Sequence, residues 1–118
     1  VSPDNEAVIP IKAYDADGHI VELKATIDTG FAGYLTLPAT TIALLRLQHD
    51  RTETYTLGDN RDVEFDVYRA TLSWDGQNRR VLVLSTESDP LIGMKILRGY
   101  VLSIDIIDGG TVHITART

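Results

Sequence analysis

The sequence has no cysteine, and only one methionine and one tryptophan occur among its 118 residues. Without cysteine, a disulfide scaffold, a zinc site with thiolate ligands and a thiol nucleophile are all excluded, whereas the cellular compartment stays open. Basic residues are also scarce, because 11 lysines and arginines face 17 aspartates and glutamates, which gives a net charge of −6. This acidic balance argues against nucleic acids and anionic membranes as partners.

Long hydrophobic runs are missing as well. No apolar run approaches the roughly 20 residues that a membrane helix needs, so we expect no membrane contact. The first six residues are acidic and polar, which predicts no signal peptide in the chain and slightly favours the cytoplasm. The composition, 43% hydrophobic and 24% charged, is typical of a globular fold, and the length suits one hydrophobic core. We therefore expect a single domain over residues 1–118.

Apolar residues alternate with polar ones along much of the chain, which is the pattern of strands with one buried face. A change of parity within one long strand predicts a β-bulge near Tyr68, and Pro10 belongs on a strand edge or at a bulge. Short runs containing glycine and aspartate join several of these segments and suit tight turns. We expect strands over residues 8–14, 21–27, 34–37, 52–57, 62–74, 80–84, 91–93, 100–107 and 111–115.

Two short helices interrupt the strands. Residues 39–47 have helical spacing, with Thr40 or Thr41 able to cap the first turn. Residues 94–98 are the second candidate, and Gly99 is placed to end it. Many short strands separated by glycine turns predict an all-β fold, a small closed barrel with one or two short helices.

The chemistry centres on Asp28-Thr29-Gly30, which follows a predicted strand directly. Alternation along the strand puts Asp28 on the face opposite Ile27, and Gly30 lets the backbone turn sharply. An acid in such a loop can accept hydrogen bonds from backbone amides. The alternative reading is a simple Asx turn that ends a strand.

A second motif, Leu91-Ile92-Gly93, lies downstream and precedes the second predicted helix. In order and spacing, the two motifs and the hairpin between them resemble the retropepsin-type aspartic proteases, and their cellular and bacterial relatives more than the viral enzymes. The resemblance covers residues from about 8 to 114. It implies the retropepsin fold and an endopeptidase that hydrolyses extended polypeptides with apolar side chains near the scissile bond, without metal or cofactor.

The same resemblance implies a homodimer. Aspartic proteolysis needs two carboxylates that share a proton around a water molecule, and this sequence has only one Asp-Thr-Gly. Asp28 from each copy would therefore meet its twin at a two-fold axis. By the same resemblance, Thr29 would brace the pair, the Gly30 amide would support the carboxylate, and the terminal segments would interleave as a sheet between the copies.

The hairpin over about residues 54–68 resembles the flap that closes over a peptide in this family, although an ordinary exposed hairpin has the same pattern. Its expected tip, residues 58–61, carries charge, which makes closure sensitive to ionic strength. The resemblance gives as candidate substrate-binding residues Phe31, Ala32, Leu57, Gly58, Asp59, Leu91 and Ile92.

Three positions depart from the viral pattern. Phe31 stands where the family usually has a small residue, Ala32 and Gly33 replace acids that hold the substrate backbone, and Met94 replaces an arginine. Cellular relatives often carry an apolar residue at the position of Met94. Phe31 and the charged flap tip favour the competing hypothesis, a non-catalytic dimer of the same fold that binds peptides or scaffolds a larger protein. A third alternative is a precursor domain that needs trimming at its N-terminus before it dimerises.

The sequence predicts no metal site. His19, His49 and His113 lie far apart and lack the spacing of metal ligands. Residues 15–18 faintly resemble the start of a calcium loop, but the later ligands are missing, so we expect a turn there.

Overall fold

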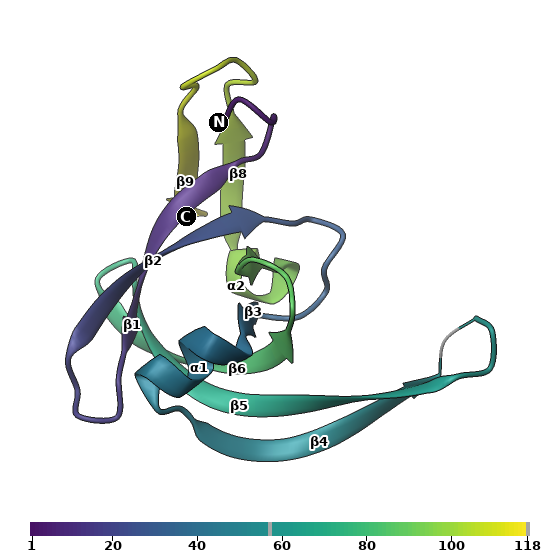
Figure 1. Ribbon diagram of the computed structural model, residues 1–118. Coiled ribbons are helices and arrows are strands. Elements are labelled where there is room, and N and C mark those ends of the chain that lie inside the picture. Colours follow the sequence, from purple (N-terminus) through teal and green to yellow (C-terminus); the bar gives the residue numbers. More distant parts are fainter. Residues whose placement is uncertain (57, 118) are drawn as a thin grey trace.

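The chain folds mostly into β-strands, with two short helices between them (Figure 1). The computed structural model describes residues 1–56 and 58–117. Neither helix in the described part of the chain is long and apolar enough to span a membrane. The elements are β1 Val8–Tyr14, β2 Ile20–Ile27, β3 Leu35–Pro38, α1 Ala39–Leu45, β4 Gln48–Thr56, β5 Asp62–Trp74, β6 Gln77–Thr86, β7 Leu91–Ile92, α2 Met94–Leu97, β8 Tyr100–Ile104 and β9 Val112–Ala116.

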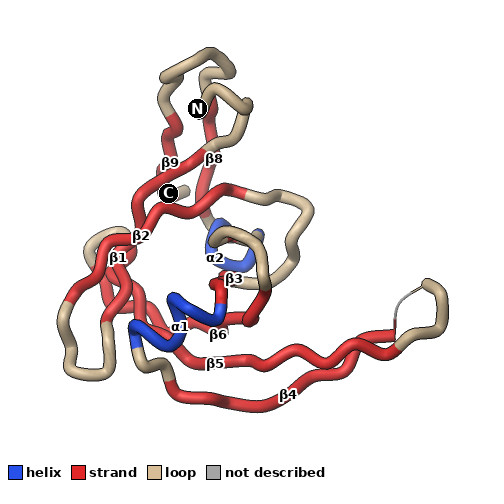
Figure 2. The backbone as a smooth tube through the Cα atoms, viewed as in Figure 1, coloured by secondary structure: helices blue, strands red, loops and turns tan. Residues whose placement is uncertain are grey.

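The predicted closed barrel is confirmed. Seven strands form one sheet in the order β1-β2-β7-β3-β6-β5-β4. Strand β1 also pairs with β5, where Lys12 lies opposite Ser73 and Ala13 opposite Leu72. This extra pairing closes a ring of six strands and leaves β4 outside it. The β4–β5 hairpin extends far beyond the barrel as an arm, which Figure 2 shows as two long red strands.

The core lies inside this ring. Alternating residues of β1, β5 and β6 point inward, and β3 contributes Leu35 and Leu37, both fully buried. The two helices close the barrel with Ile42, Leu45 and Ile96. Burying one such side chain stabilises the fold by roughly 1.5–3 kcal/mol, so this cluster holds the strands that carry the site.

The helix α1 is shorter than predicted and is capped differently. It ends at Leu45 because Arg46 adopts a left-handed conformation, with φ of 54°. The expected cap from Thr40 or Thr41 is wrong, since both residues lie inside the first turn and Pro38 occupies the N-cap position. The fixed φ of proline suits that position, so the helix starts without a side-chain cap.

The predicted bulge in β5 is also wrong, although a bulge exists at the same level of the sheet. The β5–β6 ladder runs without a shift, and the irregularity lies in β4, where Asp50 is an extra residue between His49 and Arg51. Strand β5 needs no bulge, because the change of parity in its sequence reflects a change in which face of the strand is buried. Val67 is buried on one face and Ala70 on the other.

The last two strands form a separate hairpin. Strand β8 ends at Ile104, earlier than predicted, because residues 105–111 form a loop closed by a hydrogen bond from the Asp105 amide to the Thr111 carbonyl, 3.0 Å long. The N-terminal amino group donates to the carbonyl of Gly110 at 2.7 Å, so the start of the chain contacts the hairpin tip (Figure 1). Residues 1–7 form no strand.

Candidate active site

The loop that follows β2 is clamped by the segment from β7 into α2. Strands β2 and β7 are parallel, and their last pair is Ile27 opposite Ile92. The Asp28 amide donates to the Ile92 carbonyl at 2.9 Å, and the Met94 amide donates to the Phe31 carbonyl at 2.8 Å. Backbone hydrogen bonds of this kind, made between two motifs far apart in the sequence, fix the position of the loop.

The carboxylate of Asp28 lies at the end of this strand, half-buried, inside its own turn. Its Oδ1 atom accepts a hydrogen bond from the Gly30 amide at 2.9 Å, and the Phe31 amide donates to the Asp28 carbonyl at 3.1 Å. Thr29 is exposed beside it. The turn therefore presents an acid held by one amide, next to an exposed hydroxyl.

The clamp requires a glycine at position 93. A Cβ atom on Gly93 would lie 2.6 Å from the Phe31 ring and 2.8 Å from the Phe31 carbonyl oxygen, and it would overlap the carbonyl oxygen of Gly33. Two further backbone hydrogen bonds join the segments. The Gly93 amide donates to the Tyr34 carbonyl at 2.9 Å, and the Lys95 amide donates to the Gly33 carbonyl at 3.1 Å. The close approach of the two backbones is possible because Gly93 carries no side chain, and the absence of a Cβ atom on Gly33 leaves room for the Phe31 ring.

Thr36 is a positioning residue that the sequence analysis missed. It is 3% exposed, the one buried polar residue among those described, and its hydroxyl accepts a hydrogen bond from the Leu91 amide at 3.1 Å. Through it, β3 holds the motif segment that clamps the Asp28 loop. A polar residue between two core leucines, Leu35 and Leu37, is the sequence signal that could have identified it.

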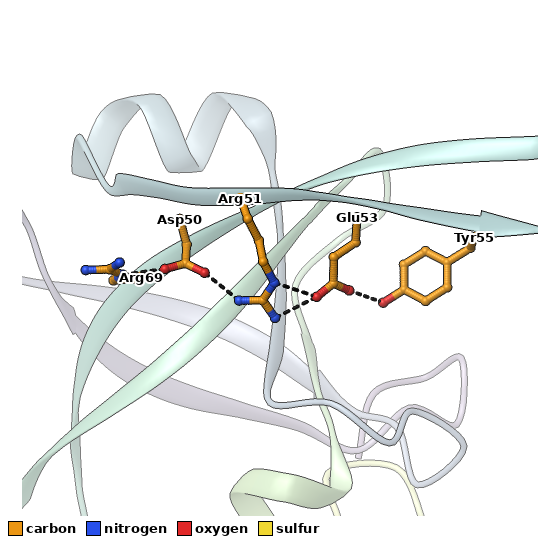
Figure 3. A network of polar contacts seen from close by, with 5 residues as sticks. All are labelled: Asp50, Arg51, Glu53, Tyr55 and Arg69. Carbon is orange, nitrogen blue, oxygen red and sulfur yellow. Dashed lines mark hydrogen bonds and ion pairs between the residues drawn. The ribbon is translucent and has the colours of Figure 1, made fainter.

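The face of the β4–β5 hairpin toward this loop carries an ordered chain of polar contacts (Figure 3). Asp50 binds Arg69, with Nε and Oδ1 2.6 Å apart, and also binds Arg51. Arg51 in turn pairs with Glu53 at 2.6 Å, and the Tyr55 hydroxyl donates to Glu53 at 2.5 Å. These contacts order the side chains along β4 in one row.

The network shifts the pKa of each acid in it. Hydrogen bonds from Arg69, and then from Arg51, lower the pKa of Asp50. The Tyr55 hydroxyl, and then Arg51, lower the pKa of Glu53. The bond to Glu53 raises the pKa of Tyr55. Both carboxylates are therefore held in their charged form.

A pocket of about 150 Å³ separates this row from the clamped loop. Its walls combine the loop with the hairpin: the loop side is apolar and aromatic, whereas the hairpin side is charged. The lining includes Phe31, Tyr34, Arg51, Glu53, Tyr55 and Lys95. The pocket meets the clamped loop at Phe31 and Gly33, and its volume is enough for about one side chain.

The overall fold is similar to that of solved structures. The protease of simian foamy virus (mac), a solution structure, is 21% identical, with a TM-score of 0.54, and the match covers 75% of this chain and 91% of that one. The EIAV protease complexed with the inhibitor HBY-793 is 18% identical, with a TM-score of 0.55, over 83% and 90% of the two chains. This is the retropepsin fold. No family model matches the sequence, and no curated protein matches it.

Within the retropepsin fold, the predicted site residues fall in three places. Asp28, Thr29, Gly30, Phe31 and Ala32 share the clamped loop, and Phe31 lines the pocket. The side chain of Ile92 is fully buried in the core, and Ile92 contacts the loop through its carbonyl, which accepts the hydrogen bond from the Asp28 amide. Leu91 is half-buried.

The remaining predicted residues belong to the tip of the β4–β5 hairpin. Gly58 and Asp59 are exposed there, and Asp59 pairs with Arg61 at 2.5 Å. Leu57 lies outside the described residues. The hairpin tip is therefore exposed and charged.

The ligand atoms of Asp15, Asp17 and His19 lie within 4.8 Å of one another at the turn between β1 and β2. The hydrogen bonds explain this cluster without a cation. Oδ1 of Asp15 accepts hydrogen bonds from the amides of Asp17 and His19, at 2.9 Å each. The hydrogen bond from the His19 amide is the main cause that lowers the pKa of Asp15. These three side chains therefore lie together because they belong to the turn predicted at residues 15–18.

Proposed function

We propose that this chain is an aspartic endopeptidase of the retropepsin type, and that it hydrolyses extended polypeptides as a homodimer. One observation carries the proposal: the half-buried Asp28 carboxylate, held by the Gly30 amide, sits on a loop clamped by the Leu91-Ile92-Gly93 segment. The fold shared with two retroviral proteases supports it, as does the inhibitor bound to one of them.

The chemistry follows from pairing two such loops. Two Asp28 carboxylates at a two-fold axis would share one proton, because like charges that close cannot both ionise. The charged one takes a proton from a bound water molecule, while the protonated one donates to the carbonyl oxygen of the scissile bond. The exposed Thr29 hydroxyl would reach the partner loop and brace the pair. The chemistry needs no metal or cofactor.

The β8–β9 hairpin is the proposed contact between copies. It is a sheet of only two strands, so within the described residues each strand has an unpaired edge. Large apolar side chains are exposed on it: Val101 is 49% exposed, Ile106 67% and Ile107 66%. Because residues 1–7 form no strand, the expected interleaving would use this hairpin rather than an N-terminal strand.

Substrate recognition is assigned to the pocket beside Phe31 and to the flap. Apolar side chains near the scissile bond would contact Phe31, Val67, Leu82 and Leu84, which line the pocket. Ala32 and Leu91 would flank the peptide backbone, and Leu57, Gly58 and Asp59 would close over it from the flap tip. Ile92 would act through its carbonyl only.

Within this fold, we assign the chain to the cellular and bacterial single-domain type. The apolar Met94 and the loss of acids at Ala32 and Gly33 support this assignment, since the viral pattern pairs an arginine with one of those acids.

A second candidate function is a peptide-binding or scaffolding dimer without turnover. The observation that favours it is Phe31, a large side chain where the resemblance leads us to expect a small one, whose ring packs over Gly33 and Gly93 and occupies part of the site. In this alternative the pocket holds a peptide but leaves no room for the scissile bond beside Asp28.

The experiment that separates the two is a digest of a peptide library between about pH 3 and pH 8, with and without an active-site-directed aspartic-protease inhibitor. Cleavage that the inhibitor blocks, and that Asp28→Asn abolishes while the dimer persists, supports the enzyme. Peptide binding without any turnover supports the scaffold. An obligate monomer at micromolar concentration would overturn both.

A further inference from the structure

A cavity of about 670 Å³, the larger of the two described, lies on the barrel next to the pocket beside Phe31. It opens between the β1–β2 turn, the end of α1 and the outer face of β5 and β6. Its walls combine aromatic rings with three arginines. The lining includes Tyr14, Tyr34, Arg46, Arg69, Arg80 and Leu82.

The two hollows are neighbours on the same face of the sheet. Tyr34 and Leu82 line both of them. Along the β5–β6 ladder, cross-strand pairs that share one face run from Leu84, opposite Val67, through Leu82 to Arg80. Leu84 belongs to the small pocket and Arg80 to the large cavity. Four residues of strand span about 13 Å, which is room for about four residues of an extended peptide.

Of the three arginines, only Arg80 lacks a partner. Arg46 pairs with Asp17 at 2.5 Å, and Arg69 pairs with Asp50 at 2.6 Å. Within residues 1–56 and 58–117, Arg80 makes no ion pair and no side-chain hydrogen bond, and it is exposed. Arg80 is therefore a cation without an ion-pair partner on a chain whose net charge is −6.

One carboxylate, that of Asp15, also lines the cavity. The Asp15 carboxylate accepts the amides of Asp17 and His19, so it belongs to its own turn. The Tyr14 hydroxyl donates to the side-chain carbonyl of Asn78 at 2.9 Å, which fixes the ring that forms one wall. The cavity therefore offers aromatic walls, one carboxylate held within its own turn, and one arginine, Arg80, without an ion-pair partner among the described residues.

We propose that this cavity extends the substrate groove and binds an acidic side chain of the peptide, about four residues from the side chain in the small pocket. This inference rests on the proposed function, since it assumes that a peptide lies beside Asp28. Arg80 forms an ion pair with the acidic side chain, and Tyr34, shared by both hollows, supports the peptide between them.

The test measures binding apart from cleavage. Fluorescein-labelled peptides of about ten residues, with a central Leu-Leu and one glutamate moved through each flanking position, are titrated with the Asp28→Asn protein, which cannot turn them over. One glutamate position should bind more tightly than its glutamine counterpart. Arg80→Gln should remove that preference, lowering affinity about three- to tenfold, and leave the glutamine peptide unaffected.

Two further variants make the result specific. Arg98→Gln is the matched control, because Arg98 is an exposed arginine that does not line the cavity, and it should leave the preference unchanged. Arg80→Glu should reverse the preference toward a lysine peptide at the same position.

The outcomes distinguish this inference from the proposed function. If the wild-type protein cleaves the peptides but no glutamate position matters, or if Arg80→Gln and Arg98→Gln behave alike, the acidic subsite is wrong and the peptidase assignment stands. If no peptide is bound or cleaved, both the acidic subsite and the proposed peptidase function are wrong. A preference that requires Arg80, with no cleavage by the wild-type protein, supports the groove as a binding site and rejects the enzyme.

Discussion

The carbonyl oxygen of Gly33 occupies the space that a Cβ atom on Gly93 would need. The clamp between the two motifs depends on this contact, because the loop bearing Asp28 and the segment entering α2 meet backbone to backbone. We expect Gly93→Ala to push the loop away, destabilise the fold by about 2–3 kcal/mol and abolish peptidase activity. Denaturant unfolding and the peptide digest measure the two effects.

Gly58→Ala is the matched control for the stability measurement. No atom lies within 4 Å of a Cβ built at Gly58, so its unfolding midpoint should stay close to that of the wild-type protein. Equal stability of the Gly93→Ala and wild-type proteins would show that the loop gives way without cost, and the clamp would lose its assigned role.

One shared site between two chains predicts a specific mixing result. When equal amounts of wild-type and Asp28→Asn chains exchange subunits, random pairing leaves a quarter of the dimers with two aspartates. Activity should then fall to about half that of the wild-type protein alone at the same wild-type concentration. A rate unaffected by the added mutant would mean that one chain carries a whole site, contrary to the proposed mechanism.

The exposed isoleucines of the β8–β9 hairpin test the proposed dimer contact. The double variant Ile106→Ser, Ile107→Ser should be monomeric by sedimentation and inactive, while its near-native circular dichroism shows that each chain remains folded. Leu44→Ser is the control, because Leu44 is 69% exposed on α1 and lies away from the hairpin. If both variants dimerise equally well, the contact lies elsewhere.

The polar network on the β4–β5 hairpin should weaken in acid. The pKa values of Asp50 and Glu53 lie below their ordinary values, so both carboxylates stabilise the folded hairpin fully above about pH 4. That stabilisation is lost as the pH falls through the lowered pKa values. Glu53→Gln should therefore melt below the wild-type protein at pH 6, and the difference should shrink as the pH falls toward 3. Thermal melts at both pH values measure this.

Glu64→Gln provides the comparison for the acid experiment. Glu64 is exposed on β5 and forms no ion pair in the described part of the chain. Its melting temperature should match that of the wild-type protein at both pH values. A Glu53→Gln deficit that stays the same between pH 6 and pH 3 would trace the effect to packing rather than to charge.

Features set by local alternation were predictable from the sequence. Strand β1 begins and ends at the expected residues, because a period of two over seven positions leaves little freedom. Strand β5 also has its expected ends, although its buried face changes along the strand. The turn at Asp28 and its bond from the Gly30 amide also follow from local chemistry. Each of these is decided by residues within a few positions of one another.

Features set by pairing across the sheet were not predictable. The bulge was expected in β5 and lies in β4, because a parity change in one strand cannot reveal which strand of a pair holds the extra residue. The row of Arg51, Glu53 and Tyr55 has the spacing of one strand face, but its link to Arg69 depends on the partner strand. Cavities, which several elements line together, are least visible of all.

The bulge has a consequence for how the chain tolerates deletion. Since His49 lies opposite Tyr68 and Arg51 opposite Val67, removing Asp50 would join these pairs into an uninterrupted ladder. Every later residue of the arm would keep its partner and its face. Asp50 is thus a removable insert: a shortened chain would retain the shape of the arm while losing the acid that joins its two strands.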